Sequence, residues 1–280
     1  MDLLVSSEWL AGQIGAGDLR LLDATYYALE PERDAAADFR AGHLPGALFL
    51  DLEHLADASD PLPSMAPGKE QFASRLAALG IGEGDRIVLY DQAPHHTSAR
   101  AWWLFRLYGI KNVALLDGGF AGWRAEGRPI ESGVADEPGG GGVPLALDHA
   151  RVRDKGEVRR IAEGGLAQIV DARSAARFTG AEGDPRPGVG RGHIPGSLSL
   201  PYPRLLERDG RWKRDAALAA EFAAAGIDLD RPIVTTCGSG ISAAILLFGL
   251  ALLGAEDTAL YDGSWSEWGA DPALPKAAGL

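Results

Sequence analysis

The chain has 280 residues, 46% of them hydrophobic, and a formal net charge of −12 at pH 7. Its length exceeds the ~100–200 residues typical of one domain, so we expect two domains, each with its own core. The acidic balance argues against non-specific binding to nucleic acid or anionic lipid, which a strongly basic surface favours. A single cysteine excludes an internal disulfide and a paired-cysteine zinc site, so we expect no metal, and nothing in the sequence indicates an organic cofactor.

Short apolar runs alternate with helical patterns along the first half of the chain. Strands of a parallel sheet are predicted at 20–25, 47–52, 86–91 and 112–117. Helices are predicted over Lys69–Leu79, where Gly80 supplies a C-terminal stop, and over Ser98–Tyr108.

The middle of the chain contains four consecutive glycines between Pro138 and Pro144. Such a composition cannot hold a helix and is typical of a linker. We therefore expect a linker at 136–147, between an N-terminal domain at 1–135 and a C-terminal domain at 148–280.

The second half repeats the alternation of strands and helices. Strands are predicted at 168–173, 198–202 and 232–237. Helices are predicted over Ala216–Ala225, ended by Gly226, and over the apolar stretch Ile241–Leu253. The pattern indicates an α/β fold with two tandem domains, each a parallel sheet with helices on both faces.

The sequence gives no indication of a membrane protein or an exported one. Residues 1–9 lack the charged-then-apolar order of a secretory signal. The stretch Ile241–Leu253 is too short to span a bilayer and contains Gly249, so we expect a buried helix there. We therefore expect a cytoplasmic protein that binds neither membrane nor nucleic acid.

Three motifs occur twice in the same order, which indicates a duplicated domain. The pairs are GHLPG at 42–46 with GHIPG at 192–196, RIVLYD at 86–91 with PIVTTC at 232–237, and LLDGGFAGW at 115–123 with LYDGSWSEW at 260–268. Functional groups of parallel α/β sheets lie just past the carboxyl ends of the strands. This rule selects Asp91 in the first copy and Cys237 in the second.

The repeated histidines have a structural interpretation. His43 and His193 each lie beside a proline in a GH[LI]PG motif, and the copy without a cysteine keeps its histidine. We therefore expect both to be buried and hydrogen-bonded to the backbone. Four tryptophans are expected in the cores: Trp102, Trp103, Trp123 and Trp268.

Cys237 lies between an apolar strand and an apolar helix, in the sequence TTCGSGIS. Gly238 and Gly240 allow a tight turn whose amide groups face inward and form an anion-binding nest. Ser239 and Ser242 add hydroxyl donors. Such surroundings stabilise a thiolate, and they would hold a persulfide in the same way. The alternative is a buried structural cysteine, which has no need of a turn rich in donors.

A cysteine before a tight anion-binding loop also occurs in phosphatases. That chemistry needs an arginine at the end of the loop to grip the phosphoryl oxygens. The corresponding position here is Ala243, and the loop contains no arginine. The sequence therefore argues against a phosphatase.

Taken together, the motifs resemble the rhodanese superfamily. The order is GHIPG, a strand ending in CGSGIS, and then YDGSWSEW, and the similarity extends from VSSEWL at 5–10 to the end of the chain. The resemblance implies two rhodanese-like domains and a sulfurtransferase activity in which Cys237 carries sulfur as a persulfide. The first half has Asp91 at the cysteine position and is similar to the inactive N-terminal domain of two-domain members.

The uncharged loop after the cysteine is similar to that of 3-mercaptopyruvate sulfurtransferases, whereas thiosulfate sulfurtransferases carry basic residues there. The resemblance implies transfer of sulfur from 3-mercaptopyruvate to cyanide, a thiol or thioredoxin, with release of pyruvate. It implies that Ser239 helps to activate the thiol and the donor. It also implies that Arg177 and Arg186 bind the carboxylate and keto group of the donor, a task that suits the guanidinium fork. The remaining donor-binding residues would be Gly238, Gly240, Ile241 and Ser242.

The sequence departs from the family pattern in its first half. The family often has an acidic residue and a histidine there, which assist the serine. Glu53 matches the acidic position, whereas Ser64 stands where histidine is usual. The sequence alone does not assign His54, His95 or His96 to the missing role.

Three alternatives remain open at this stage. The first is a thiosulfate sulfurtransferase, which the uncharged loop disfavours. The second is a persulfide carrier or redox-sensing module, which would show a reactive Cys237 but poor turnover with small donors. The third is a non-catalytic binding scaffold, which an unreactive thiol would favour.

Overall fold

The computed structural model describes residues 1–92 and 96–279. The chain forms two compact units. The first comprises residues 1–58, 66–148 and 208–212, and the second comprises residues 59–65, 149–207 and 213 onwards. Each unit contains a five-stranded parallel sheet flanked by helices, which confirms the predicted α/β fold with two similar halves.

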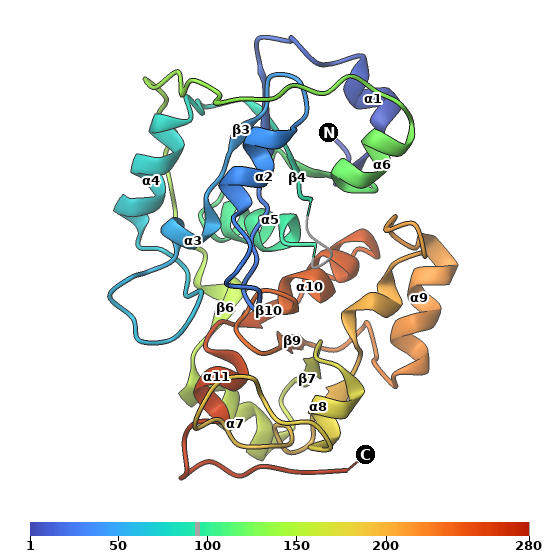
Figure 1. The fold of residues 1–280 in the computed structure, drawn as a ribbon. Helices are drawn as coiled ribbons and strands as arrows, with labels where there is room; N and C mark the ends of the chain where they lie inside the picture. Colours follow the sequence, from blue (N-terminus) through green and yellow to red (C-terminus); the bar gives the residue numbers. More distant parts are fainter. Residues whose placement is uncertain (93–95, 280) are drawn as a thin grey trace. The chain divides into compact units, whose positions relative to one another are not determined.

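The first unit is built on the strand order β1-β5-β4-β2-β3 (Figure 1). Its strands are β1 Leu4–Val5, β2 Leu19–Asp23, β3 Leu48–Phe49, β4 Arg86–Tyr90 and β5 Val113–Leu116. Its helices are α1 Ser7–Ala11, α2 Ala35–Ala41, α3 Leu52–Leu55, α4 Lys69–Ala78, α5 Ser98–Leu107 and α6 Gly119–Ala125. All neighbouring strands run parallel, so their carboxyl ends meet at one edge of the sheet.

The second unit has the equivalent strand order, β6-β10-β9-β7-β8. Its strands are β6 Val152–Arg153, β7 Gln168–Asp171, β8 Leu198–Ser199, β9 Ile233–Thr236 and β10 Thr258–Tyr261. Its α-helices are α7 Lys155–Gly164, α8 Ala175–Thr179, α9 Asp215–Ala224, α10 Ala243–Leu252 and α11 Ser264–Trp268. Two short 3-10 helices cover His149–Arg151 and Tyr202–Leu205.

Every strand and helix predicted from the sequence is present, although β3 and β8 are shorter than expected. Gly80 and Gly226 follow α4 and α9 with φ of +66° and +76°, the left-handed conformation that ends helices. The sequence patterns missed β1, β6 and β10, and also α1, α2, α3, α6, α7, α8 and α11. Most of these are too short to show a period, and the longest, α7, buries only Val158 and Ile161.

One face of the first sheet packs against α1, α2 and α6. Because successive strand residues point to opposite faces, Val88 and Tyr90 of β4 share one face. They form a buried cluster that includes Leu10 of α1, Phe39 of α2 and Trp123 of α6. Figure 1 shows α1 and α6 on the same side of this sheet. Helix α5 covers the opposite face, against β4 and β5.

The second sheet is covered in the same way. Val234 of β9 and Tyr261 of β10 lie in a buried cluster with Val158 of α7 and with Trp265 and Trp268 of α11. Helix α10 packs on the other side, against β9 and β10, and is apolar all round, as expected for the predicted buried helix. No helix in the described part of the chain is both long and apolar enough to cross a bilayer.

The structural prediction for the repeated histidines is confirmed. The side chains of His43 and His193 are buried, and Nδ1 of each lies 2.8 Å from a backbone carbonyl oxygen, of Phe39 and Phe178 respectively. Each imidazole also stacks on the ring of that phenylalanine, with centroids 4.0 and 3.8 Å apart. The four predicted core tryptophans are buried as well: Trp102, Trp103, Trp123 and Trp268.

The glycine-rich segment 136–147 packs against the first unit. The amides of Gly139 and Gly141 donate to two carbonyl groups at the end of α4. A Cβ at Gly141 would lie only 2.5 Å from the backbone nitrogen of Ile81, so the close approach requires glycine there. The segment is irregular, as predicted, but its backbone hydrogen bonds fix it to α4.

Candidate active site

Cys237 follows β9 at the carboxyl edge of the second sheet. Its side chain is 1% exposed, and the loop 237–242 leads directly into α10. Residues Asp171 of β7 and Thr236 of β9 are register partners, as are Asp23 and Tyr90 in the first unit. Cys237 therefore occupies the same place in its sheet as Asp91 does in the first sheet, as the repeat predicted.

The hydroxyl group of Ser264 anchors the cysteine loop. Its oxygen accepts hydrogen bonds from the amides of Cys237 and Gly240, at 3.2 and 3.1 Å, and donates to the carbonyl of Tyr261 at 2.8 Å. Ser264 is 0% exposed, so these contacts are shielded from water. One side chain thus joins both ends of the turn to the end of β10.

Ser264 adopts a backbone conformation that is costly for a serine. Its φ is +50°, whereas its counterpart in the first unit is Gly119, with φ of +54°. A residue with a Cβ pays about 1–2 kcal/mol in this region, and such strain persists where the surroundings require it. The sequence interpretation missed Ser264, although the change from DGG to DGS between the repeats was the available signal.

The first turn of α11 fixes two carbonyl groups of the loop. The amide of Trp265 donates to the carbonyl of Cys237, and the amide of Ser266 donates to that of Gly238, both at 2.9 Å. Within residues 1–92 and 96–279, no hydrogen-bond acceptor is present for the backbone amides of four further loop residues: Gly238, Ser239, Ile241 and Ser242. These amides, rather than those of Cys237 and Gly240, are available to an anion at the loop.

The two units fill the equivalent position with different groups. In the first unit, Oδ2 of Asp91 accepts a hydrogen bond of 2.8 Å from the amide of Ser98, the first residue of α5. A carboxylate therefore occupies the positive end of that helix. In the second unit, Cys237 precedes α10, whose first turn contains no acidic residue. The duplicated framework thus accommodates an anion, which Asp91 supplies in one copy and a Cys237 thiolate or persulfide can supply in the other.

Arg186 lies against the cysteine loop. A Cβ at Gly238 would be 3.2 Å from its Nη1, so a side chain there would require the guanidinium to shift by a few tenths of an ångström. The side chain of Asp184 holds this arginine through an ion pair of 3.1 Å. The structure therefore brings together three of the predicted site features, namely Cys237, the glycine turn and Arg186.

Arg177 and Ser239 are placed less directly. Arg177 lies on α8, and its Nε pairs with Glu182 at 3.4 Å. In the described part of the chain, no hydrogen bond or ion pair joins Arg177 to the cysteine loop, and none joins the hydroxyl of Ser239 to Cys237. The side chain of Ser239 is nevertheless buried within that loop.

A buried ion pair supports the second site, and the sequence interpretation missed it. Arg173 pairs with Asp171 at 2.6 Å, and their side chains are 3% and 1% exposed. Arg173 also donates to the carbonyl of Gly192 and lies 4.4 Å from the ring centroid of Trp265. The pair thereby connects the end of β7 to the GHIPG turn and to α11, which holds the cysteine loop.

The first unit replaces this ion pair with neutral partners. Thr25 stands at the position of Arg173, and Asp23 accepts hydrogen bonds from Thr25 and Gln92. Burial raises the pKa of Asp23 to about 6, although these hydrogen bonds counteract the shift. The first unit therefore keeps the carboxylate but lacks the arginine.

The residues considered for an assisting role belong to different units. Glu53 is exposed on α3 in the first unit, whereas the segment that contains Ser64 belongs to the second unit. Ser64 has φ of +62°. Nδ1 of His54 lies 2.8 Å from Oδ2 of Asp51, and His95 lies outside the described residues.

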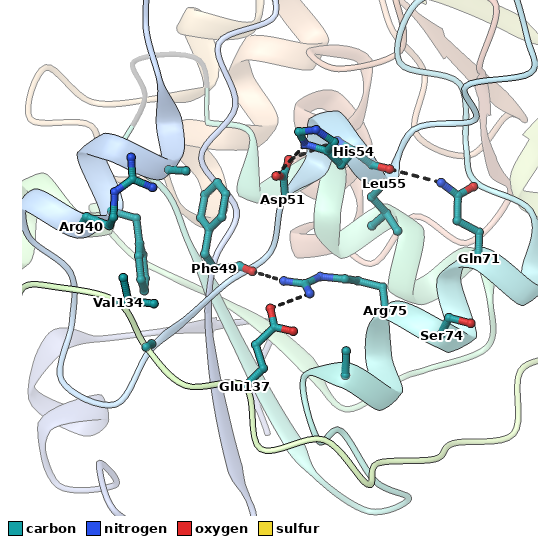
Figure 2. A pocket seen from close by; sticks show the side chains of 14 residues that line it. Arg40, Phe49, Asp51, His54, Leu55, Gln71, Ser74, Arg75, Val134 and Glu137 are labelled. Atoms are coloured by element: carbon teal, nitrogen blue, oxygen red, sulfur yellow. Dashed lines mark hydrogen bonds and ion pairs between the residues drawn. The ribbon is translucent and has the colours of Figure 1, made fainter.

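A cavity of about 560 Å³ lies in the first unit, among α2, α3, α4 and the segment 134–137 (Figure 2). Figure 2 shows Arg75 reaching across it to the carbonyl of Phe49 and to Glu137, with which it forms an ion pair of 2.6 Å. None of the site residues predicted from the sequence lines this cavity. Within the described residues, no cluster of histidine, cysteine, aspartate and glutamate is arranged to hold a metal ion.

Comparison with known proteins identifies the family. Residues 6–126 and 154–271 each match the rhodanese-like domain. The chain belongs to the rhodanese superfamily. Its fold is therefore a pair of rhodanese domains, as the sequence motifs indicated.

Its relatives within this superfamily are sulfur-group transferases. The chain is 39% identical to the 3-mercaptopyruvate sulfurtransferase of Escherichia coli K12, over 97% of this chain and 96% of that protein. It is 36% identical to the human 3-mercaptopyruvate sulfurtransferase, over 95% and 91% of the two chains. It is also 37% identical to the thiosulfate sulfurtransferase of Gallus gallus, over 95% and 92%.

Solved structures agree with this assignment. The crystal structure of SseA from Escherichia coli, a 3-mercaptopyruvate sulfurtransferase, superposes with a TM-score of 0.86 at 36% identity. The match covers 95% of this rhodanese chain and all of that one. The Tum1 protein of Saccharomyces cerevisiae superposes with a TM-score of 0.89 at 28% identity, over 99% of both chains.

Proposed function

We propose that this protein is a 3-mercaptopyruvate sulfurtransferase that carries sulfur on Cys237. The observation that supports this most directly is the comparison of the two units. Where the first has a carboxylate at the start of α5, the second has Cys237 in a loop with four amides that have no acceptor among the described residues, and Arg186 lies against the adjacent Gly238. The hydrogen-bond donors at this place can hold the sulfur of the proposed persulfide.

The proposed first step transfers sulfur from the donor to the enzyme. The Cys237 thiolate attacks the sulfur of 3-mercaptopyruvate and forms an S–S bond. The carbon–sulfur bond breaks, and its electron pair remains on the carbon, which takes up a proton to give pyruvate. Cys237 is left as a persulfide. Arg177 and Arg186 hold the carboxylate and keto oxygens of the donor during this step, because guanidinium groups bind such planar anions with two parallel hydrogen bonds.

The second step regenerates the thiolate. A thiophilic acceptor such as cyanide, a small thiol or a thioredoxin attacks the outer sulfur, and the electron pair of the S–S bond returns to Cys237. The loop amides of Gly238, Ser239, Ile241 and Ser242 stabilise the thiolate and persulfide sulfur in both steps. This covalent relay needs no metal or organic cofactor and predicts ping-pong kinetics.

The remaining site residues receive supporting roles in this proposal. Ser239 donates its hydroxyl hydrogen to the sulfur or to the donor. Glu53 and Ser64, which precede Asp91 in the sequence, assist Ser239. Ser64 stands in place of the histidine that is usual in the family. The C-terminal domain, 148–280, is the catalytic one, and the N-terminal domain, 1–135, has no nucleophile. The proposed compartment is the cytoplasm, where a lone cysteine is kept reduced.

Thiosulfate is the second candidate donor, favoured by the 37% identity to a thiosulfate sulfurtransferase. The site argues for mercaptopyruvate, because the loop of residues 237–242 carries no charged side chain to neutralise a dianion. A persulfide carrier that serves only protein partners is a third possibility.

The test compares kcat/KM for 3-mercaptopyruvate and thiosulfate, with cyanide as the common acceptor and Cys237→Ser as the control. A strong preference for mercaptopyruvate supports the proposal. A preference for thiosulfate would keep Cys237 as nucleophile but overturn the donor. Near-zero turnover with both, from a thiol that still reacts, would indicate the carrier instead.

A further inference from the structure

Asp184 has a buried carboxylate and takes no part in the two proposed reaction steps. Its side chain is 0% exposed, and Oδ1 accepts hydrogen bonds from the backbone nitrogen and Nη1 of Arg186, at 3.0 and 3.1 Å. Its Oδ2 atom is buried without a hydrogen-bond partner among the residues that the structure describes. A buried carboxylate oxygen without a donor lowers stability. A neutral amide oxygen could accept the two hydrogen bonds from Arg186, so these bonds alone do not explain why a charged residue stands here.

The charge of Asp184 acts at the sulfur site through Arg186. The guanidinium of Arg186 lies against Gly238, the residue that follows Cys237. Its ion pair with Asp184 offsets its positive charge, so the pair presents hydrogen-bond donors with little net charge. The side chain of Arg186 is only 20% exposed, so water screens this effect weakly.

We propose that Asp184 makes the site selective for a donor with one negative charge over a donor with two. This inference rests on the proposed function, because it concerns the choice between 3-mercaptopyruvate, a monoanion, and thiosulfate, a dianion. Asp184 repels any anion that Arg186 attracts, and by Coulomb's law it repels a dianion twice as strongly. Specificity of this kind arises from a repulsive element as well as from attractive contacts.

The variant Asp184→Asn removes the charge and keeps the geometry. The amide oxygen of asparagine can still accept both hydrogen bonds from Arg186, so the guanidinium stays in place. The measurement is kcat/KM for thiosulfate divided by kcat/KM for 3-mercaptopyruvate, with cyanide as acceptor. We expect this ratio to rise about tenfold, the effect of about 1.4 kcal/mol at 25 °C from one unit charge. The rise should shrink at high ionic strength.

Glu182→Gln is the matched control. It removes the same charge from the same loop, but the side chain of Glu182 is 53% exposed, and its pair with Arg177 is longer, at 3.4 Å. Exposed pairs are screened by water and salt. We expect the donor ratio of this variant to change by less than about twofold.

Each outcome separates this inference from the proposed function. If Asp184→Asn lowers kcat/KM equally for both donors, Asp184 has only a structural role and the inference fails. A wild-type protein that prefers thiosulfate or turns over neither donor contradicts the proposed function instead. In that case, calorimetry with Cys237→Ser, with and without Asp184→Asn, measures pyruvate and thiosulfate binding directly. A larger gain for thiosulfate supports charge selection, and equal gains overturn it.

Discussion

Replacing Ser264 by alanine and by glycine separates the two features of this residue, its hydroxyl and its backbone conformation. The hydroxyl oxygen accepts hydrogen bonds from the amides of Cys237 and Gly240, while φ is +50°. Alanine removes the hydroxyl and keeps the strained Cβ. Glycine removes both, and the first unit shows that glycine adopts this conformation at the equivalent Gly119.

The two substitutions should differ by the cost of the strain. Either one removes the hydroxyl oxygen that accepts two buried amide hydrogen bonds, at about 1–3 kcal/mol each. We expect Ser264→Ala to lower the free energy of unfolding of the second unit by about 2–6 kcal/mol. Ser264→Gly should lower it by about 1 kcal/mol less, because the left-handed conformation favours glycine. Both should slow sulfur transfer, since the loop loses the side chain that joins its two ends.

The assay is urea denaturation of the full chain, followed by tryptophan fluorescence, with kcat measured on the same samples. The buried Trp265 and Trp268 lie next to Ser264 in α11 and report on this unit. An alanine variant as stable as wild type would show that the hydroxyl does not anchor the loop. A glycine variant less stable than the alanine variant would refute the strain argument.

Three further predictions follow from the structure. Cys237→Ser should abolish turnover and leave the circular dichroism spectrum unchanged; retained activity would remove Cys237 from the mechanism. Gly238→Ala should raise KM for the donor about fivefold with a smaller change in kcat, because its Cβ makes the guanidinium of Arg186 shift by a few tenths of an ångström; an unchanged KM would contradict this placement. The folded-state pKa of Asp23, about 6, exceeds the unfolded value of 3.8, so stability present below pH 3.8 is lost as pH rises through 6. Between pH 3.5 and 7.5, wild type should therefore lose up to about 3 kcal/mol of unfolding free energy relative to Asp23→Asn; parallel pH profiles would contradict the shift.

The fold was predictable because the chain contains the same domain twice. The repeat aligns β4 with β9 and so predicts equivalent places for Asp91 and Cys237, which they occupy in the two sheets. Helix α10 was also predictable, because its apolar sequence continues over several helical turns. Two-residue strands such as β1 and β6 were not found, because tertiary packing rather than local pattern forms them.

The site was predictable only in part. Cys237, the two glycines of the turn and the loop residues Ser239 and Ser242 lie in one short stretch of sequence, so a local pattern predicts them. Ser264, Asp184 and Arg173 reach the loop or its supports from distant segments, and their roles depend on burial and hydrogen-bond geometry. A sequence pattern does not show that Oδ2 of Asp184 is buried without a partner among the described residues, or that Ser264 has a left-handed backbone conformation.

The most direct test of the central proposal is intact-protein mass spectrometry after 3-mercaptopyruvate is added without an acceptor. The proposal predicts a mass gain of one sulfur atom, located on Cys237, with one pyruvate released per chain and loss of the added sulfur when cyanide follows. An unmodified protein, or equal pyruvate release from Cys237→Ser, would contradict it.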